Sequence, residues 1–154
     1  MSAIKRHFPK VNCIAAVATA GIAHGMLVAD RLDLPFVYVR SSAKDHGMKN
    51  LIEGQLPQNA FVLVIEDLIS TGKSSLNAVK ALREKKAEIA GLMAIFSYGF
   101  ELAENAFRQA NCKLITLSGY QALLQEAIYI EYIDSSLLPD LNLWRENPAK
   151  WKAF

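Results

Sequence analysis

The sequence predicts an α/β fold, with a doubly wound and mostly parallel sheet flanked by helices. Apolar segments of strand length alternate with segments whose apolar residues recur at helical spacing. The apolar segment 61–65 lacks the alternation of a half-exposed strand, which indicates a strand buried on both faces, as in a parallel sheet. Because the chain has 154 residues and is 52% hydrophobic, we expect one domain, 1–154, with a sizeable core.

The first half of the chain contains the segments that define this pattern. Proline lacks an amide hydrogen, so Pro9 should end the first helix. The alanines at 15, 16 and 18 weaken the first strand without breaking its apolar run. The predicted elements are, in order, a helix at 2–8, a strand at 11–18, a helix to about Leu32, a strand at 36–40 and the strand at 61–65.

The second half continues the alternation. Leu102, Ala106 and Phe107 form an apolar stripe that we expect to face the core. Ser118 is a suitable N-cap for the next helix. The predicted elements are a helix at 75–85, a strand at 89–97, a helix at 101–110, a strand at 113–117, a helix at 120–127, a helix from about Ile133, a turn near Pro139 and a short final helix that packs on the body, with Trp144 and Trp151 as packing anchors.

Bulk properties exclude several classes of protein. The net charge is +2 and no basic run is longer than Lys85-Lys86, so nothing indicates a nucleic-acid or membrane-surface binder. No apolar stretch approaches the roughly 18 residues of a membrane span, and the N-terminus lacks a signal core, so we expect a cytoplasmic protein. Cys13 and Cys112 lack CxxC spacing and are expected to be small buried hydrophobes.

Two adjacent acids follow the central apolar segment. Glu66 and Asp67 precede a Ser/Thr/Gly loop and a helix, and ligands of open α/β sheets bind at such strand ends. Backbone amides of 71–74 at the start of that helix could together hold a phosphate. The acids suit sugar hydroxyls, or a divalent cation held through water. The alternative is an ordinary strand-to-helix turn with a Ser/Thr cap.

The sequence Gly72-Lys73-Ser74 also invites comparison with a nucleotide P-loop. That pattern requires a glycine five residues before Gly72, and Asp67 occupies the position. A nucleotide-hydrolysing P-loop is therefore excluded.

A second small-residue loop, 19–25, follows the first strand. One interpretation is a tight turn that uses the backbone freedom of Gly21. The other is a second anion site, here for a pyrophosphate. His24 taken alone is more often a surface residue of a helix than a ligand.

A polar segment of about ten residues, 41–50, lies between apolar segments and is longer than the usual connection. It carries Lys44, His46 and Lys49, with Arg40 beside it. A solvated loop is one interpretation. The other is a mobile loop whose donors close over an anionic substrate that must be shielded from water.

Together these segments resemble the orotate phosphoribosyltransferases, a family of type I phosphoribosyltransferases that use phosphoribosyl diphosphate (PRPP). The resemblance covers nearly the whole chain in the right order. The Lys-x-His-Gly loop followed by Ile-Glu-Gly is its most discriminating part, because it separates this family from the purine phosphoribosyltransferases. The matching segments are Val17–Ile22, Tyr38–Arg40, Lys44–Gly47, Ile52–Gly54 and Val64–Gly72.

The resemblance implies the type I phosphoribosyltransferase fold and an enzyme of pyrimidine biosynthesis. The implied reaction is Mg²⁺-dependent transfer of the phosphoribosyl group from PRPP to N1 of orotate, giving orotidine 5′-monophosphate and pyrophosphate. It also implies a homodimer in which the 41–54 loop reaches the neighbouring site, with no nucleic-acid or membrane partner.

Site residues are implied by position. Glu66 and Asp67 would hold the ribose hydroxyls, with Mg²⁺ held through PRPP rather than directly by the protein. Ser70 would also touch orotate, and Lys44, His46 and Asp67 would be catalytic. The implied PRPP-binding residues are Thr19, Ala20, Gly21, Ile22, Arg40, Lys44, His46, Glu66, Asp67, Leu68, Ile69, Ser70, Thr71, Gly72, Lys73 and Ser74.

The sequence departs from the family pattern at three places. Ser41 replaces a usual lysine, and 96–100 lacks the arginine that usually clasps orotate's carboxylate. The resemblance begins just before the first core strand, so we expect the N-terminal hood of the family to be missing. The alternatives are another base acceptor, such as a purine, or a PRPP-binding regulator or inactive remnant, against which Lys44 and His46 argue.

Overall fold

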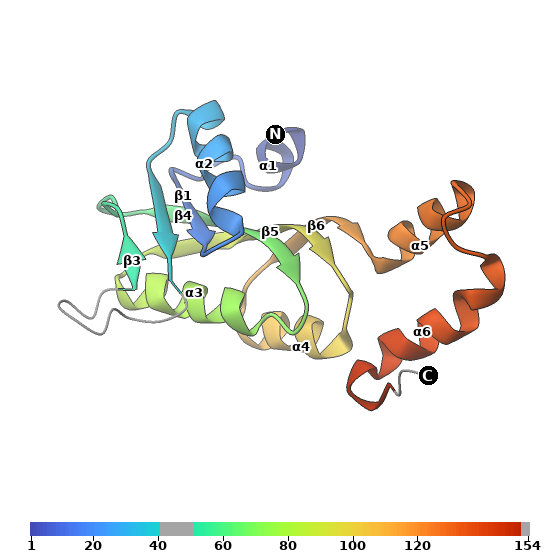
Figure 1. Ribbon diagram of the computed structural model, residues 1–154. Coiled ribbons are helices and arrows are strands. Elements are labelled where there is room, and N and C mark those ends of the chain that lie inside the picture. Colours follow the sequence, from blue (N-terminus) through green and yellow to red (C-terminus); the bar gives the residue numbers. More distant parts are fainter. Residues whose placement is uncertain (41–50, 152–154) are drawn as a thin grey trace.

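The structure is a computed structural model that describes residues 1–40 and 51–151. Its centre is a six-stranded sheet in the order β3-β2-β1-β4-β5-β6 (Figure 1). The strands are β1 Cys13–Val17, β2 Phe36–Val39, β3 Ile52–Glu53, β4 Phe61–Ile69, β5 Glu88–Ser97 and β6 Leu114–Gly119.

All pairings in the sheet are parallel except one. β1 lies between β2 and β4, and β5 lies between β4 and β6. The short strand β3, which the sequence pattern does not predict, pairs antiparallel with β2. The chain builds the sheet outward from β1 on one side and from β4 on the other, so the strand order reverses between β1 and β4.

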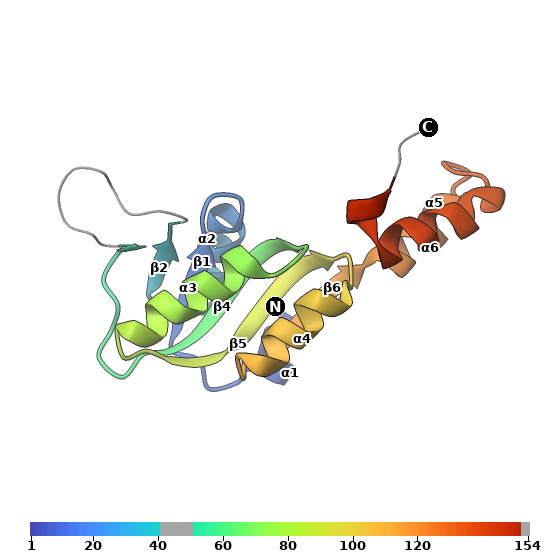
Figure 2. The ribbon, with the colours of Figure 1, turned by 90° about the horizontal axis from the view of Figure 1, so that it is seen from below.

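Helices cover both faces of the sheet (Figures 1 and 2). On one face, α1 Ser2–His7 and α2 Gly21–Leu32 pack over a core that includes Leu63 and Ile65. On the other face, α3 Lys73–Glu84 and α4 Glu101–Gln109 pack over a core that includes Val62. The predicted doubly wound sheet is confirmed, and β4 is buried on both faces as its continuous apolar run indicates.

The central strand is longer than its apolar segment. β4 extends to Ile69, and Ile69 pairs with Ser97 of β5. Glu66 and Asp67 therefore belong to the strand itself rather than to the loop after it. The strand continues past its apolar segment because residues up to Ile69 pair with β5, and this pairing cannot be recognised from the composition of β4 alone. The helix after the loop also begins earlier than expected, at Lys73.

The C-terminal part forms a helical pair beyond the β6 edge (Figures 1 and 2). It comprises α5 Tyr120–Tyr129, a 3₁₀ turn Ser135–Leu137, α6 Leu138–Glu146 and a 3₁₀ turn Pro148–Lys150. The predicted helix from about Ile133 with a turn near Pro139 is wrong: α6 begins at Leu138, and this proline lies in its first turn, where its missing amide costs no hydrogen bond.

Other local predictions have mixed outcomes. Ser118 is part of β6 and does not cap α5, whose N-cap is Gly119. Phe107 of the predicted stripe is buried as expected, but Leu102 is 66% exposed, and Ala103 joins Phe107 on the buried face of α4. The expectation that both cysteines are buried is confirmed.

The predicted anchor Trp144 does pack against the body. Its ring lies 5.6 Å from that of Tyr98, 6.0 Å from Phe100 and 5.4 Å from Tyr120, centroid to centroid. These contacts attach α6 to the turn between β5 and α4. Within 1–40 and 51–151, no helix combines the length and apolarity needed to cross a membrane.

Candidate functional site

The site lies where β1 and β4 end side by side and the strand order reverses. The chain turns from β1 into α2 through 18–20, where the Ala18–Thr19 peptide bond is cis, and from β4 into α3 through 70–72. The first N–H groups of each helix have no partner within the helix. Two helix N-termini therefore border the end of β4, an arrangement that suits an anion.

Glu66 is the buried acid of this site. Its side chain is 4% exposed, and the Ser75 hydroxyl donates a 2.9 Å hydrogen bond to its Oε2. The backbone N–H of Asp67 donates to Oε1 at 3.3 Å. Burial, followed by the neighbouring Asp67 carboxyl, raises the pKa of Glu66 to about 7, although both hydrogen bonds act to lower it. Glu66 therefore exchanges its proton near neutral pH, while Asp67 is more accessible.

Gly21 allows the first loop to approach β4. A Cβ at this position would lie 2.9 Å from the Ile65 carbonyl oxygen and 3.5 Å from Glu66 Oε1. Gly21 is not among the residues with a left-handed backbone angle. The glycine is therefore needed for close packing against the acidic strand end, not for an unusual turn.

Gly72 has a different role. It is the N-cap of α3 with φ of 76°, a left-handed conformation that suits glycine. A Cβ here would lie 2.7 Å from Cε2 of the Phe107 ring. The turn into α3 therefore requires glycine at position 72 for two reasons, its left-handed backbone angle and the closeness of the Phe107 ring.

A cavity of about 350 Å³ lies between the ends of β1 and β2 and the start of α3. Arg40 and Lys73 bring positive charge to it, and Thr71 and Ser74 bring hydroxyl groups. Arg40 is also 3.6 Å from Glu53, but this pair is partly exposed and weak. The chemistry of the wall suits an anion such as a phosphate. The lining residues are Val17, Val39, Arg40, Thr71, Lys73, Ser74, Asn77 and Ala78.

The structure brings most of the predicted site residues together. Thr19, Ala20 and Ser70 are exposed at the strand ends, whereas the Ile69 side chain is in the core and its carbonyl oxygen accepts from the Tyr98 N–H at 3.1 Å. Lys44 and His46 lie outside the described residues. In the part of the chain that the structure describes, no group of three or more His, Cys, Asp or Glu residues could hold a metal ion.

Sequence reasoning missed Ser75 and Asn77. Both lie on α3, where Ser75 contacts Glu66 and Asn77 lines the cavity that Arg40 and Lys73 also line. Helical spacing from Gly72 offers a signal for them, since polar residues within the first turns of the helix can face the strand ends.

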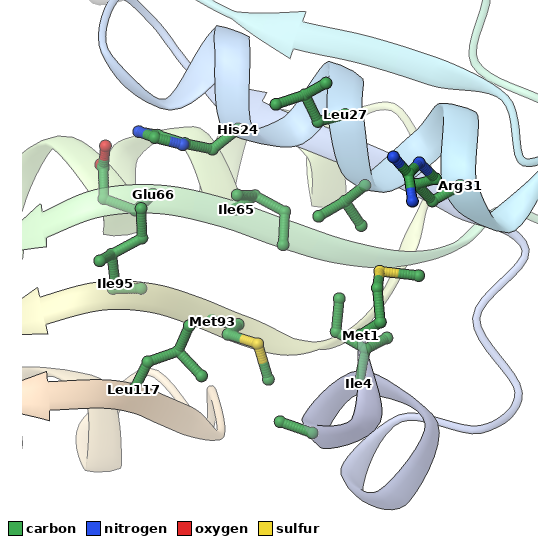
Figure 3. A pocket seen from close by; sticks show the side chains of 13 residues that line it. Met1, Ile4, His24, Leu27, Arg31, Ile65, Glu66, Met93, Ile95 and Leu117 are labelled. Atoms are coloured by element: carbon green, nitrogen blue, oxygen red, sulfur yellow. The ribbon is translucent and has the colours of Figure 1, made fainter.

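A second cavity, of about 330 Å³, opens on the α1 and α2 side of the sheet (Figure 3). Glu66 and His24 lie at one end and Arg31 at the other, with a mostly apolar wall between them. The labelled wall residues include Ile4, Leu27, Ile65, Met93, Ile95 and Leu117.

Comparisons with known proteins agree with this geometry. Residues 3–116 match the model of the phosphoribosyl transferase domain. The chain is 50% identical over 149 residues to an orotate phosphoribosyltransferase of Cytophaga hutchinsonii, covering 97% of this chain and 71% of the relative. It is 51% identical over 150 residues to one of Bacteroides thetaiotaomicron, again covering 97% and 71%.

Solved structures support the fold. An orotate phosphoribosyltransferase of Aeropyrum pernix superposes with a TM-score of 0.74 at 24% identity, covering 82% of this chain and 70% of that one. A UMP synthase of Leishmania donovani gives a TM-score of 0.77 at 20% identity, covering 97% of this chain and 31% of that one. The domain match and the two relatives that are 50% and 51% identical show that this chain belongs to the orotate phosphoribosyltransferase family.

Proposed function

We propose that this protein transfers the phosphoribosyl group of PRPP to N1 of orotate, forming orotidine 5′-monophosphate and pyrophosphate. Its relatives of 50% and 51% identity carry the name of that activity. The structural observation that supports it most is the acidic end of β4, set between two helix-opening loops, since PRPP carries a sugar between two anionic groups.

Each part of PRPP has a candidate place. The 5′-phosphate would bind the amides of 71–74, next to the cavity lined by Lys73 and Ser74. The ribose hydroxyls would meet Glu66 and Asp67. The pyrophosphate would face the loop 19–22 and Arg40, with Ser70 reaching toward orotate.

Magnesium fits this site only together with the substrate. Mg²⁺ keeps several waters and is usually bound through few carboxylates plus substrate phosphates, rather than in an all-protein cage. Within the described part of the chain, the site offers Glu66 and Asp67 but no three-ligand cluster. We infer that PRPP itself would hold Mg²⁺, with these carboxylates on the ribose, and that the ion would neutralise charge on the pyrophosphate.

The chain's own residues would act mainly through charge. Negative charge grows on the departing pyrophosphate, and Arg40, Lys44 and His46 would stabilise it more in the transition state than before it. The ribosyl centre becomes cation-like, which favours the nearby carboxylates of Glu66 and Asp67. Orotate N1 is already nucleophilic, so no activated side chain is needed. In a homodimer, the 41–54 loop would reach into the site of the neighbouring subunit.

A different base acceptor is the second candidate. The segment 96–100, at the end of β5 and in the turn after it, contains aromatic rings and no arginine for a carboxylate. A screen of orotate, uracil, adenine and guanine with Mg²⁺–PRPP would separate the two candidates. Nucleotide formation from orotate alone supports the proposal, and turnover of a purine with none of orotate contradicts it.

The direct test is calorimetric titration of this chain with Mg²⁺–PRPP, then with orotate and with orotidine 5′-monophosphate. We expect PRPP and the nucleotide to bind. Binding of PRPP without the nucleotide would indicate a PRPP-binding regulator or a remnant without a pyrimidine site. Failure of PRPP itself to bind would contradict the proposal.

A further inference from the structure

Ser75 is a buried polar residue on the face of α3 that meets the end of β4. Its side chain is only 1% exposed, and its hydroxyl is 2.9 Å from Glu66 Oε2. The PRPP-binding segment implied by family resemblance stops at Ser74, one residue earlier. Ser75 therefore lies behind the proposed binding surface and contacts one of its members.

Two hydrogen bonds restrain the Glu66 carboxylate. Ser75 donates to one oxygen from α3, and the backbone N–H of Asp67 donates to the other from β4 at 3.3 Å. On the α2 side, Gly21 brings the backbone of α2 close to the same carboxylate: a Cβ at this position would lie 2.9 Å from the Ile65 carbonyl oxygen and 3.5 Å from Oε1. The first turns of α2 and α3 thus both approach this one carboxylate.

We propose that Ser75 is a positioning residue that orients Glu66 toward the ribose, an inference that rests on the proposed function. The hydroxyl connects the helix whose N-terminus would bind the 5′-phosphate to the acid that would bind the sugar. It holds these two groups of PRPP contacts at a fixed spacing without touching the substrate.

Orienting Glu66 should strengthen ligand binding because a glutamate side chain is flexible. A glutamate side chain has several rotamers, and ordering it at the moment of binding would cost free energy. Above its pKa of about 7, Glu66 is a charged acceptor, and a hydrogen bond to a charged acceptor is stronger than one between neutral groups. Ser75 thus orders Glu66 before the ligand arrives, which lowers the cost of binding.

The test begins with Ser75→Ala, measured by calorimetric titration with Mg²⁺–PRPP. We expect binding about tenfold weaker, because a buried acceptor loses its donor and its fixed orientation. Ser97→Ala is the matched control: Ser97 is also buried, at 8% exposure, and its hydroxyl accepts from the Gly99 N–H at 3.0 Å, away from Glu66. Its affinity for Mg²⁺–PRPP should stay within twofold of the wild type.

A double-mutant cycle with Glu66→Ala separates positioning from a general loss of structure. If Ser75 acts through Glu66, Ser75→Ala has no further effect on affinity in the Glu66→Ala background. Equal tenfold losses in both backgrounds would overturn the proposal, as would unchanged affinity of the single Ser75→Ala variant. Thermal unfolding of each variant verifies that it is folded.

The outcomes distinguish this inference from the proposed function. PRPP binding is measured without any base, so a wild-type chain that binds PRPP but makes no orotidine 5′-monophosphate would contradict orotate transfer while the cycle still decides the role of Ser75. A wild-type chain that does not bind Mg²⁺–PRPP would overturn both.

Discussion

Adjacent residues of the same chemistry have different surroundings at the end of β4. Glu66 is buried and held by Ser75, and burial raises its pKa to about 7. Asp67 is partly exposed and is one cause of that shift. The two acids therefore have separate consequences: Glu66 makes stability depend on pH, and Asp67 is the more accessible partner for a ligand.

Stability should fall as the pH rises toward neutrality because of Glu66. An ordinary glutamate has a pKa of 4.5, so between 4.5 and about 7 the folded state keeps a proton that the unfolded state has lost. The resulting loss of stability is on the order of 3 kcal/mol across this range. Glu66→Gln should remove most of this dependence, as urea unfolding at pH 5 and pH 8 would measure. Identical pH dependence in the variant and the wild type would contradict the assignment, since other titrating groups cancel in the comparison.

Asp67 is the residue whose charge should matter most for the ligand. Asp67→Asn keeps the size of the side chain but removes the negative charge that would accept from the ribose hydroxyls. We expect Mg²⁺–PRPP affinity to fall roughly tenfold or more, since hydrogen bonds to charged groups exceed those to neutral ones. Calorimetry that gives wild-type affinity would remove Asp67 from the ribose site.

At the scale of elements, the junctions between them determine the site. The turn from β4 into α3 is fixed by Gly72 and by the Phe107 ring of α4. The turn from β5 into α4 is covered by α6 through Trp144. Each junction depends on a contact from an element distant in sequence, and each can be tested by one substitution.

Gly72→Ala should destabilise the fold by about 1–3 kcal/mol, because it adds a Cβ in a left-handed conformation. The new atom would also lie 2.7 Å from the Phe107 ring. Gly99→Ala is a matched control, because Gly99 has a φ of 67° but no atom within 4 Å of the added Cβ. Denaturant unfolding should show a greater loss for Gly72→Ala, and equal losses would exclude a role for Phe107.

Trp144→Ala should release α6 from the body without unfolding the sheet. The tryptophan contacts three aromatic rings, whereas no residue of α6 is fully buried. We expect amide hydrogen exchange in 138–146 to accelerate roughly tenfold or more, with little change in β4. Leu143→Ala, at an exposed position of the same helix, should leave the exchange rates near those of the wild type. Unchanged protection of α6 in the tryptophan variant would show that α5 alone holds it.

For the whole molecule, the sheet topology gathers groups that are far apart in sequence. The strand order reverses between β1 and β4, so the loops 18–20 and 70–72 end at the same edge. The proposed homodimer adds a third segment, the 41–54 loop with Lys44, from the neighbouring subunit. If two chains share each site, two different inactive or weakened variants can complement each other in a mixed dimer, which is not possible when each chain has a complete site of its own.

At a PRPP concentration well below what the Asp67→Asn variant needs, a mixture of Lys44→Ala and Asp67→Asn chains should be more active than either variant alone. Lys44→Ala by itself should lower turnover far more than PRPP affinity. If the loop crosses to the partner, each hybrid dimer contains one site with both substitutions and one with neither. Random exchange would then recover about a quarter of wild-type turnover. Turnover that remains at the level of the separate variants would contradict the shared site.

The sequence by itself determined the alternation of parallel strands and helices up to α5, the burial of β4 and the position of the acids and of the Gly72 turn. These features follow from local causes: apolar periodicity, the missing amide of proline and the backbone freedom of glycine. The aromatic anchor Trp144 could also be predicted, because a large amphipathic ring near the end of a polar segment is most simply explained by packing.

The tertiary structure alone decided which groups meet. It extended β4 to Ile69 through pairing with β5, turned Leu102 outward and Ala103 inward, and assigned Gly21 to close packing rather than to a turn. It also placed Ser75 on Glu66, nine residues away in sequence. The reason is physical: a hydrogen bond or a packing contact depends on the position of both partners, and periodicity along one segment specifies only its own.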